Sequence, residues 1–277
     1  MIELNDLTKK FGDFTAVDHI NMTIETGEFF GLLGPNGAGK TTTISMISTI
    51  LLPTAGKIQI DGTKVDRKAS ALKRKLSVIT QEYSMRQDMT ANEVMEYQGR
   101  LYYMPKKEIK NKTEQLLEYY GLKEYRHKNV RSMSGGMKRK LMICRALMTD
   151  PEILLLDEPT AGMDALSRRQ MWNLLRQVNN RNMTIVLTTH YIEEAQALCD
   201  RVALLNSGKL QKIGSPAVLI DELGSFAVDR MAEDGLITSY FHKREDAIAY
   251  LESEDGEAAF RSTTLEDVFV DCAGRKI

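Results

Sequence analysis

The stretch GPNGAGKT at residues 34–41 combines residue types that suit the binding of phosphate groups. Gly34, Gly39, Lys40 and Thr41 fit the spacing G-x-x-x-x-G-K-[ST], directly after an apolar run and before a helical pattern. Glycines let backbone N–H groups point toward one anion, and the first turn of the following helix adds unpaired N–H groups. Lysine adds a positive charge and threonine a ligand for Mg²⁺. A plain glycine-rich turn is the alternative, but the flanking elements favour a nucleoside triphosphate site.

Two adjacent carboxylates form a second candidate for chemistry. Asp157 and Glu158 end the apolar run ILLLDE, which is typical of a buried strand. In that position Asp157 could hold Mg²⁺, and Glu158 could act as a general base toward an attacking water. Taken alone, the two acids could equally begin a loop. The phosphate loop in the same chain favours the catalytic interpretation.

A second glycine-rich helix start lies at residues 133–137, MSGGM. Ser134 suits a helix N-cap, which is its simplest interpretation. Gly135 and Gly136 cost about 1 kcal/mol each relative to alanine, yet they allow an anion to approach the backbone closely. One nucleotide has no obvious need of two such ends from one chain. Two chains facing each other would place each nucleotide between one phosphate loop and the other chain's glycine pair.

Strand-like runs alternate with helical patterns along most of the chain. Short apolar runs occur at residues 29–33, 76–80, 153–157, 184–190 and 201–205, and helical patterns cover 41–50, 92–104, 106–120, 135–149, 165–180 and 191–199. Runs of this kind are typical of buried strands in a mostly parallel sheet. The alternation therefore predicts an α/β fold with a doubly wound core.

Two regions depart from this alternation. Residues 84–150 contain three helical patterns and no convincing strand, which predicts an inserted helical subdomain. NSGKL at 206–210 predicts a hairpin turn. The composition shifts after residue 216, and residues 224–277 predict the order strand, helix, strand, helix, with Thr264 as the N-cap of the last helix. We therefore expect a core domain over residues 1–215 and a small α+β accessory domain over 217–277.

Composition limits the class of protein. The 277 residues carry a net charge of −1, which argues against nucleic acid as a partner because phosphate binding over a large surface needs a basic face. Cys144, Cys199 and Cys272 are odd in number and widely spaced, which predicts reduced thiols. The start of the chain lacks an apolar signal core, and no apolar run approaches the roughly 18 residues of a membrane helix. Any link to a membrane is therefore expected to run through a partner.

Together these motifs resemble those of the nucleotide-binding subunit of ATP-binding cassette (ABC) transporters, over about residues 1–215 and in the family's order. GPNGAGKTT resembles the phosphate loop, MSGGM the signature, and ILLLDEP the acidic strand. Gln81 falls where the family has its glutamine loop, Asp164 in the loop that faces the partner subunit, and His190 at the switch histidine. Phe11 occupies the place of an aromatic residue that stacks on adenine.

The resemblance implies a role for each position. Glu158 would be the catalytic base, His190 would contact the γ-phosphate, and Thr41, Gln81 and Asp157 would surround Mg²⁺. The residues implied to bind ATP in one subunit are Phe11, Gly34, Pro35, Asn36, Gly37, Ala38, Gly39, Lys40, Thr41, Thr42 and Gln81. Those implied to act across the dimer are Ser134, Gly135, Gly136 and Asp164. From the residues alone, Gln81 could be a surface residue, His190 structural and Phe11 a core aromatic.

The signature departs from the usual leucine-Ser-Gly-Gly-glutamine, because Met133 and Met137 flank the glycines and methionine cannot donate an amide hydrogen bond. SGGMKRKL and TTLEDVFVDCAG are similar to segments of drug-export and sodium-efflux ATPase subunits. The resemblance then implies an ATP-hydrolysing subunit that pairs head to tail with a second copy or a homologous subunit. It would power export by a separate polytopic permease at the cytoplasmic face of the membrane. An importer subunit and a non-transport ATP-dependent switch are the alternatives.

Overall fold

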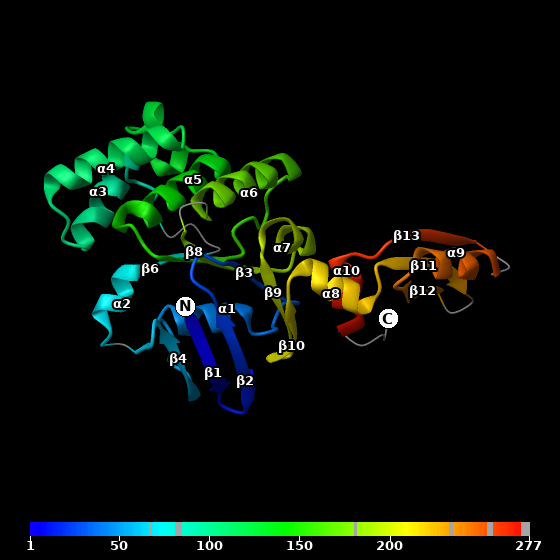
Figure 1. Cartoon of the computed structure of the whole chain (residues 1–277). Helices are drawn as coiled ribbons and strands as arrows, with labels where there is room; N and C mark the ends of the chain where they lie inside the picture. Colours follow the sequence, from blue (N-terminus) through cyan, green and yellow to red (C-terminus); the bar gives the residue numbers. More distant parts are fainter. Residues whose placement is uncertain (67, 81–84, 180–181, 233–234, 254–256, 273–277) are drawn as a thin grey trace.

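The computed structural model describes residues 1–66, 68–80, 85–179, 182–232, 235–253 and 257–272, arranged in three sheets and their covering helices (Figure 1). The central six-stranded sheet has the order β10-β9-β3-β8-β7-β6. Its strands are β3 (Phe29–Leu33), β6 (Leu76–Ile79), β7 (Ile153–Asp157), β8 (Thr184–Thr189), β9 (Arg201–Asn206) and β10 (Lys209–Gly214). Within the described ranges no helix is both long and apolar enough to cross a bilayer.

The central sheet explains why distant motifs meet. Neighbouring strands β9, β3, β8, β7 and β6 pair in parallel, and every residue of β3, β7 and β8 is buried. Carboxyl ends of parallel strands lie at one edge of a sheet, where ligands bind. The phosphate loop after β3, the two acids at the end of β7 and His190 after β8 therefore converge. The α/β class is confirmed, and β10 is an antiparallel addition formed by the expected hairpin with β9.

A four-stranded antiparallel sheet of order β2-β1-β4-β5 covers the other side of the core (Figure 1). Its strands are β1 (Ile2–Phe11), β2 (Phe14–Ile24), β4 (Ala55–Ile60) and β5 (Thr63–Lys64). The sequence interpretation identifies none of them. Repeated register shifts along β1 break the period-two alternation of buried and exposed residues by which such strands are recognised.

Helices cover the central sheet and form the insertion. The helices of the core are α1 (Lys40–Ile47), α2 (Ser70–Lys75), α6 (Ala165–Asn179) and α7 (Ile192–Leu198), and those of the insertion are α3 (Ala91–Leu101), α4 (Lys106–Tyr119) and α5 (Gly135–Ala146). Three short 3₁₀ turns, Lys123–Tyr125, Val130–Ser132 and Leu147–Thr149, connect the latter group. Thr90 and Glu93 form a reciprocal capping box at the start of α3. The insertion contains the three helices that the sequence predicts, grouped above the sheet (Figure 1).

The C-terminal region stands to one side and ends by returning to the core (Figure 1). It contains α8 (Pro216–Leu223), β11 (Phe226–Ala232), β12 (Gly235–Phe241), α9 (Arg244–Ser253), β13 (Ala258–Ser262) and α10 (Leu265–Cys272), with sheet order β12-β11-β13. The expected order of strand, helix, strand, helix is wrong because β12 is a further strand. Its GLITSYF sequence mixes exposed apolar and half-buried polar residues, so it lacks a clear alternation.

One half-buried arginine, Arg261, links the last helix to this small sheet. Arg261 on β13 pairs with Asp229 on β11 at 2.6 Å and with Asp267 on α10 at 2.7 Å. The backbone N–H of Thr264 also donates to Asp267, at 2.8 Å, so Thr264 lies at the start of α10 as expected. In turn, Leu265 of α10 belongs to the same buried cluster as the central sheet. Arg261 therefore connects the small sheet to α10, and α10 packs against the core.

The Asp267 carboxylate makes this attachment sensitive to acid. Burial raises the pKa of Asp267, but hydrogen bonds from Arg261 and Thr264 outweigh it and lower the pKa from 3.8 to about 2. A carboxylate whose pKa is lower in the folded than in the unfolded protein stabilises the fold at pH values above its unfolded pKa. This stabilisation is lost as the pH falls toward the pKa of the folded state. Asp267→Asn should therefore lower the melting temperature at pH 7 by roughly 2–4 °C, for a loss of about 1 kcal/mol.

Calorimetry between pH 7 and pH 2 checks this prediction. The difference between Asp267→Asn and the wild type should shrink as pH falls from 4 to 2. Glu266→Gln, which removes the exposed neighbouring carboxylate, is the matched control and should match the wild type at pH 7. A difference for Asp267→Asn that stays constant over the whole range would contradict the assignment.

Candidate functional site

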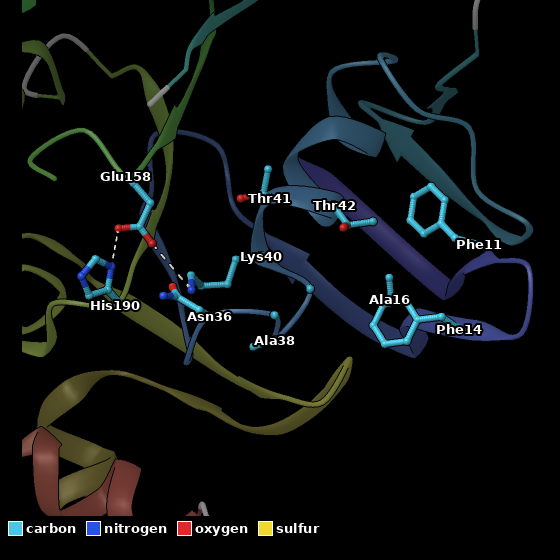
Figure 2. A pocket seen from close by; sticks show the side chains of 12 residues that line it. Phe11, Phe14, Ala16, Asn36, Ala38, Lys40, Thr41, Thr42, Glu158 and His190 are labelled. Carbon is cyan, nitrogen blue, oxygen red and sulfur yellow. Dashed lines mark hydrogen bonds and ion pairs between the residues drawn. The ribbon is translucent and has the colours of Figure 1, made fainter. Parts of the chain in front are cut away.

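A pocket of about 320 Å³ opens at the carboxyl edge of the central sheet (Figure 2). It collects residues from the start of the chain, the phosphate loop and the ends of β7 and β8. Its lining residues are Phe11, Phe14, Ala16, Asn36, Gly37, Ala38, Gly39, Lys40, Thr41, Thr42, Glu158 and His190. Most of the residues that the sequence interpretation places around one nucleotide therefore lie together.

Backbone conformation forms the cradle. Gly37 and Gly39 have positive φ angles of 82° and 98°, which residues other than glycine rarely adopt. A Cβ on Gly39 would lie 2.5 Å from the carbonyl oxygen of Ala16, so the loop can approach β2 this closely only without a side chain. Helix α1 begins at the next residue, Lys40. Its unpaired N–H groups and positive end suit an anion at the mouth of the loop.

Lys40 carries the positive charge of the cradle into a buried position. Its side chain is only 6% exposed, and Nζ donates to the carbonyl oxygens of Gly34 at 2.7 Å and Pro35 at 3.1 Å. Burial lowers the pKa of Lys40, while Glu158 Oε1, at 3.6 Å, opposes the shift. An ammonium group in this setting is stabilised further by any anion bound in the pocket.

Glu158 and His190 point toward each other across the pocket (Figure 2). Glu158 Oε2 lies 2.6 Å from Nδ1 of His190, which is hydrogen-bond distance. The backbone of Glu158 has a φ of 50°, in the left-handed region that is strained for a residue with a side chain. Its N–H donates to the carbonyl oxygen of Thr188 at 3.1 Å, which holds this conformation. A nearly buried carboxylate is thus fixed where it can accept a proton from a water molecule.

Asp157 and two hydroxyl groups form the polar floor beside the cradle. Thr41 Oγ1 donates to Asp157 Oδ1 at 3.0 Å, and Thr188 Oγ1 donates to the same oxygen at 2.5 Å. A carboxylate and a hydroxyl beside a phosphate cradle are the hard oxygen ligands that Mg²⁺ prefers. No group of three His, Cys, Asp or Glu side chains in the described ranges could hold a metal alone. Mg²⁺ commonly binds through one or two protein groups and completes its shell with phosphates and water.

Thr188 is absent from the sequence interpretation, although it precedes His190 by two residues. Its hydroxyl is fully buried, donates to Asp157 and accepts from the N–H of Glu158 at 3.1 Å. One side chain on β8 therefore orients both acids at the end of β7. A threonine inside an apolar strand, TIVLTTH, is the only signal that the sequence offers for it.

The aromatic end of the pocket contains two phenylalanines. Phe11 and Phe14 face each other across the turn between β1 and β2, and their exposed fractions are 48% and 62%. Lys9 Nζ lies 5.1 Å from the centroid of the Phe11 ring, a cation–π distance. Large aromatic rings so exposed beside a phosphate cradle could stack on a nucleotide base. Phe14 is a second candidate that the sequence interpretation does not name.

Several expected residues lie away from the pocket lining. Ser134 caps α5 by accepting from the N–H of Met137 at 3.3 Å, and Gly135 and Gly136 are exposed at the same helix start. Asp164 caps α6 by accepting from the N–H of Ser167 at 2.8 Å. Ser134 and Asp164 therefore have local structural roles as helix caps within one chain. Gln81 lies outside the described residues.

Known proteins match the chain over the same region. A family model described as "ABC transporter" matches residues 17–161. The linearmycin resistance ATP-binding protein of Bacillus subtilis is 37% identical over 236 residues, covering 85% of this chain and 76% of that protein. A Nod factor export ATP-binding protein of Burkholderia lata is 35% identical over 297 residues, covering 100% of this chain and 98% of that protein.

Solved structures agree in fold. A dimeric ATP-binding cassette in a post-hydrolysis state, bound to ADP and Pi, aligns with a TM-score of 0.69 and 28% identity, covering 78% of this chain and 98% of that one. The cbiO1 protein of Clostridium perfringens, part of an ABC transporter complex, aligns with a TM-score of 0.72 and 27% identity, covering 77% and 88%. Together with the phosphate cradle and the two acids, these matches show that the chain belongs to the ABC transporter family. It is an ATP-binding, ATP-hydrolysing subunit of the kind found in that family.

Proposed function

We propose that this ATPase powers export of a substrate by a separate membrane permease, as a head-to-tail dimer that encloses two ATP molecules. The observation that carries the catalytic part is the placement of Glu158 between Lys40 and His190, at 3.6 Å and 2.6 Å, in the mouth of a phosphate cradle. Export is favoured over import because the curated relatives quoted above include a protein named for Nod factor export.

Each pocket residue has a separate role in the proposed hydrolysis of ATP. The N–H groups at the start of α1 and the ammonium of Lys40 hold the β- and γ-phosphates, and Phe11 stacks on adenine. Glu158 accepts a proton from the water that attacks the γ-phosphorus, and the bond to the β-phosphate oxygen breaks to give ADP and phosphate. His190 contacts the γ-phosphate. Mg²⁺, held by Thr41 and Asp157, supplies charge neutralisation for the phosphates when bound.

The dimer follows from what one chain leaves incomplete. Ser134, Gly135 and Gly136 are exposed at the start of α5, yet they do not line the pocket of their own chain. A partner copy in the opposite orientation would bring them to the γ-phosphate side of the nucleotide. The solved cassette bound to ADP and Pi is itself dimeric, which supports this arrangement. Asp164 would then lie at the contact between copies.

An exposed apolar surface on the insertion supports a membrane partner. Leu101 and Tyr103 at the end of α3 are 58% and 87% exposed, and Ile50 after α1 is 60% exposed. A groove lined by Ser48, Thr49, Gln98 and Tyr102, among others, brings these two parts of the chain together. The three exposed apolar residues are therefore sequence neighbours of residues that line one groove, and exposed apolar surface of this kind is a candidate contact site for another protein. We propose that the permease binds here and holds the ATPase at the cytoplasmic face of the membrane.

Glu158→Gln tests the chemistry and the dimer together. The amide keeps the shape of the side chain but cannot accept the proton from water, so kcat should fall by about 10²–10⁴-fold. ATP binding should persist, and the trapped complex should elute as a dimer in ATP, measured by light scattering. Glu152→Gln, which changes an exposed carboxylate immediately before β7, should hydrolyse ATP like the wild type. Wild-type turnover in Glu158→Gln would exclude it as the base.

The same trapped variant tests the transport role. Tagged Glu158→Gln, purified with ATP from native membranes in detergent, should carry a polytopic membrane protein with it. A ribosomal or chromosomal partner in place of a membrane protein would overturn export and favour a soluble ATP-dependent switch. A permease together with a substrate-capture protein outside the membrane would favour import.

Thr188→Val tests the role of the buried hydroxyl beside Asp157. Valine fills the same volume but cannot donate to the carboxylate, so the Asp157 ligand is less well oriented. The Mg²⁺ concentration that gives half-maximal ATPase activity should rise about tenfold, measured by titration at saturating ATP. Thr188→Ser keeps the hydroxyl and should restore the wild-type requirement. Identical Mg²⁺ curves for the valine variant and the wild type would contradict this role.

A further inference from the structure

The imidazole of His190 is held from two directions. Its Nδ1 bonds to Glu158 at 2.6 Å, and its ring lies against that of Tyr191, with 4.1 Å between centroids and 38° between planes. The His190 side chain is 39% exposed, and Glu158 and Tyr191 are two of its contacts with the protein. One hydrogen bond fixes a distance but leaves the ring plane free to turn about a soft torsion. Contact with Tyr191 restricts that rotation.

Tyr191 is held in turn by helix α6. The guanidinium carbon of Arg168 lies 4.6 Å from the centroid of the Tyr191 ring, a cation–π distance. Among the described residues Arg168 Nε is buried without a hydrogen-bond partner, a costly state. Its guanidinium also lies 4.0 Å from the Glu193 carboxylate. The aromatic ring and this carboxylate are therefore the contacts that place the guanidinium.

Arg168 lies one turn from the part of α6 that faces a partner in the proposed dimer. Its backbone N–H donates to the carbonyl oxygen of Asp164 at 2.9 Å. A shift of Asp164 would thus be passed to Arg168, then to Tyr191, and from there to His190. Packed side chains and short hydrogen bonds of this kind can carry coupling when they have two arrangements.

A separate contact keeps α6 and α7 together whatever happens to Tyr191. Glu194 on α7 is fully buried and accepts from Trp172 Nε1 on α6 at 3.0 Å and from Thr160 Oγ1 at 2.8 Å. The attachment of α7 to the core therefore does not depend on the ring of Tyr191. Trp172 is the one tryptophan of the chain, so its fluorescence reports directly on this contact.

We infer that Tyr191 is a positioning residue. Held by its contact with Arg168, the Tyr191 ring sets the plane of the His190 imidazole against Glu158. The same contact links the orientation of His190 to the start of α6. The inference rests on the proposed roles of His190 and Asp164. It requires the aromatic face of residue 191 and not its hydroxyl, because the ring of Tyr191 makes the contacts with His190 and Arg168. Tyr191 touches neither ATP nor the reacting water in this account.

Steady-state ATPase kinetics on single and double variants test the inference. Tyr191→Leu keeps the bulk but loses the ring, and should lower kcat about tenfold while KM for ATP stays within about twofold. Tyr191→Phe should restore kcat to within about threefold of the wild type. Arg168→Met should also lower kcat. The double variant Arg168→Met with Tyr191→Leu should have a kcat no lower than that of Tyr191→Leu alone, because the effects of substitutions at two contacting residues are not additive.

A matched control uses another tyrosine–cation pair of the chain. Lys128 Nζ lies 5.6 Å from the ring centroid of Tyr125, and neither residue lines the nucleotide pocket. Tyr125→Leu should leave kcat unchanged. Unaltered Trp172 fluorescence shows that each variant is folded around α6 and α7; if Tyr191→Leu fails this check, Arg168→Met decides.

Measurements on His190→Ala beside the Tyr191 variants separate the inference from the proposed function. Wild-type kcat in folded Tyr191→Leu, or equal losses in Tyr191→Leu and Tyr191→Phe, would overturn the positioning role. His190→Ala, measured in parallel, should lose hydrolysis if the proposed role of His190 is right. Activity lost in His190→Ala but kept in Tyr191→Leu would leave the proposed function standing and reject the inference alone. Activity kept in His190→Ala would reject the proposed role of His190 and, with it, the inference about Tyr191.

Discussion

A buried ammonium group is the constraint on which the rest of the site depends. Lys40 is taken out of water at the base of a loop, where two carbonyl oxygens and one carboxylate are its partners. Burying a charge is costly unless it is paired and hydrogen-bonded. The loop must therefore keep its glycine conformations, the strand must deliver Glu158 to the same place, and the pocket must remain open to an anion. A triphosphate meets all of these requirements.

Parallel strands solve the geometric part of this problem. Because β3, β7 and β8 are neighbours, the residues that follow them meet at one edge although up to about 150 residues separate them in the chain. Local strain is tolerated there: Glu158 keeps a left-handed backbone that its neighbours on β8 stabilise. The helical insertion between β6 and β7 adds a surface without disturbing this edge.

Local sequence signals were sufficient for part of this arrangement. The phosphate loop and the buried runs FFGLL and ILLLD could be predicted, because glycine spacing and continuous apolar runs are local properties. Strands β1 and β2 could not, because bulges interrupt their alternation. Which strands and helices lie side by side decides the roles of Thr188 and Phe14 and the contact between Arg168 and Tyr191. Local sequence patterns do not contain that information. Ser134 shows a further limit: within one chain it only caps a helix.

In the proposed dimer each nucleotide site is shared by two copies, and mixing two inactivated variants tests this sharing. Lys40→Ala destroys the cradle, and Ser134→Arg blocks the exposed helix start. Each variant alone should be nearly inactive. Mixed together, they should regain ATPase activity, because a heterodimer joins the intact cradle of one copy to the intact helix start of the other. Full activity of Ser134→Arg by itself, or a mixture as inactive as its components, would contradict a shared site.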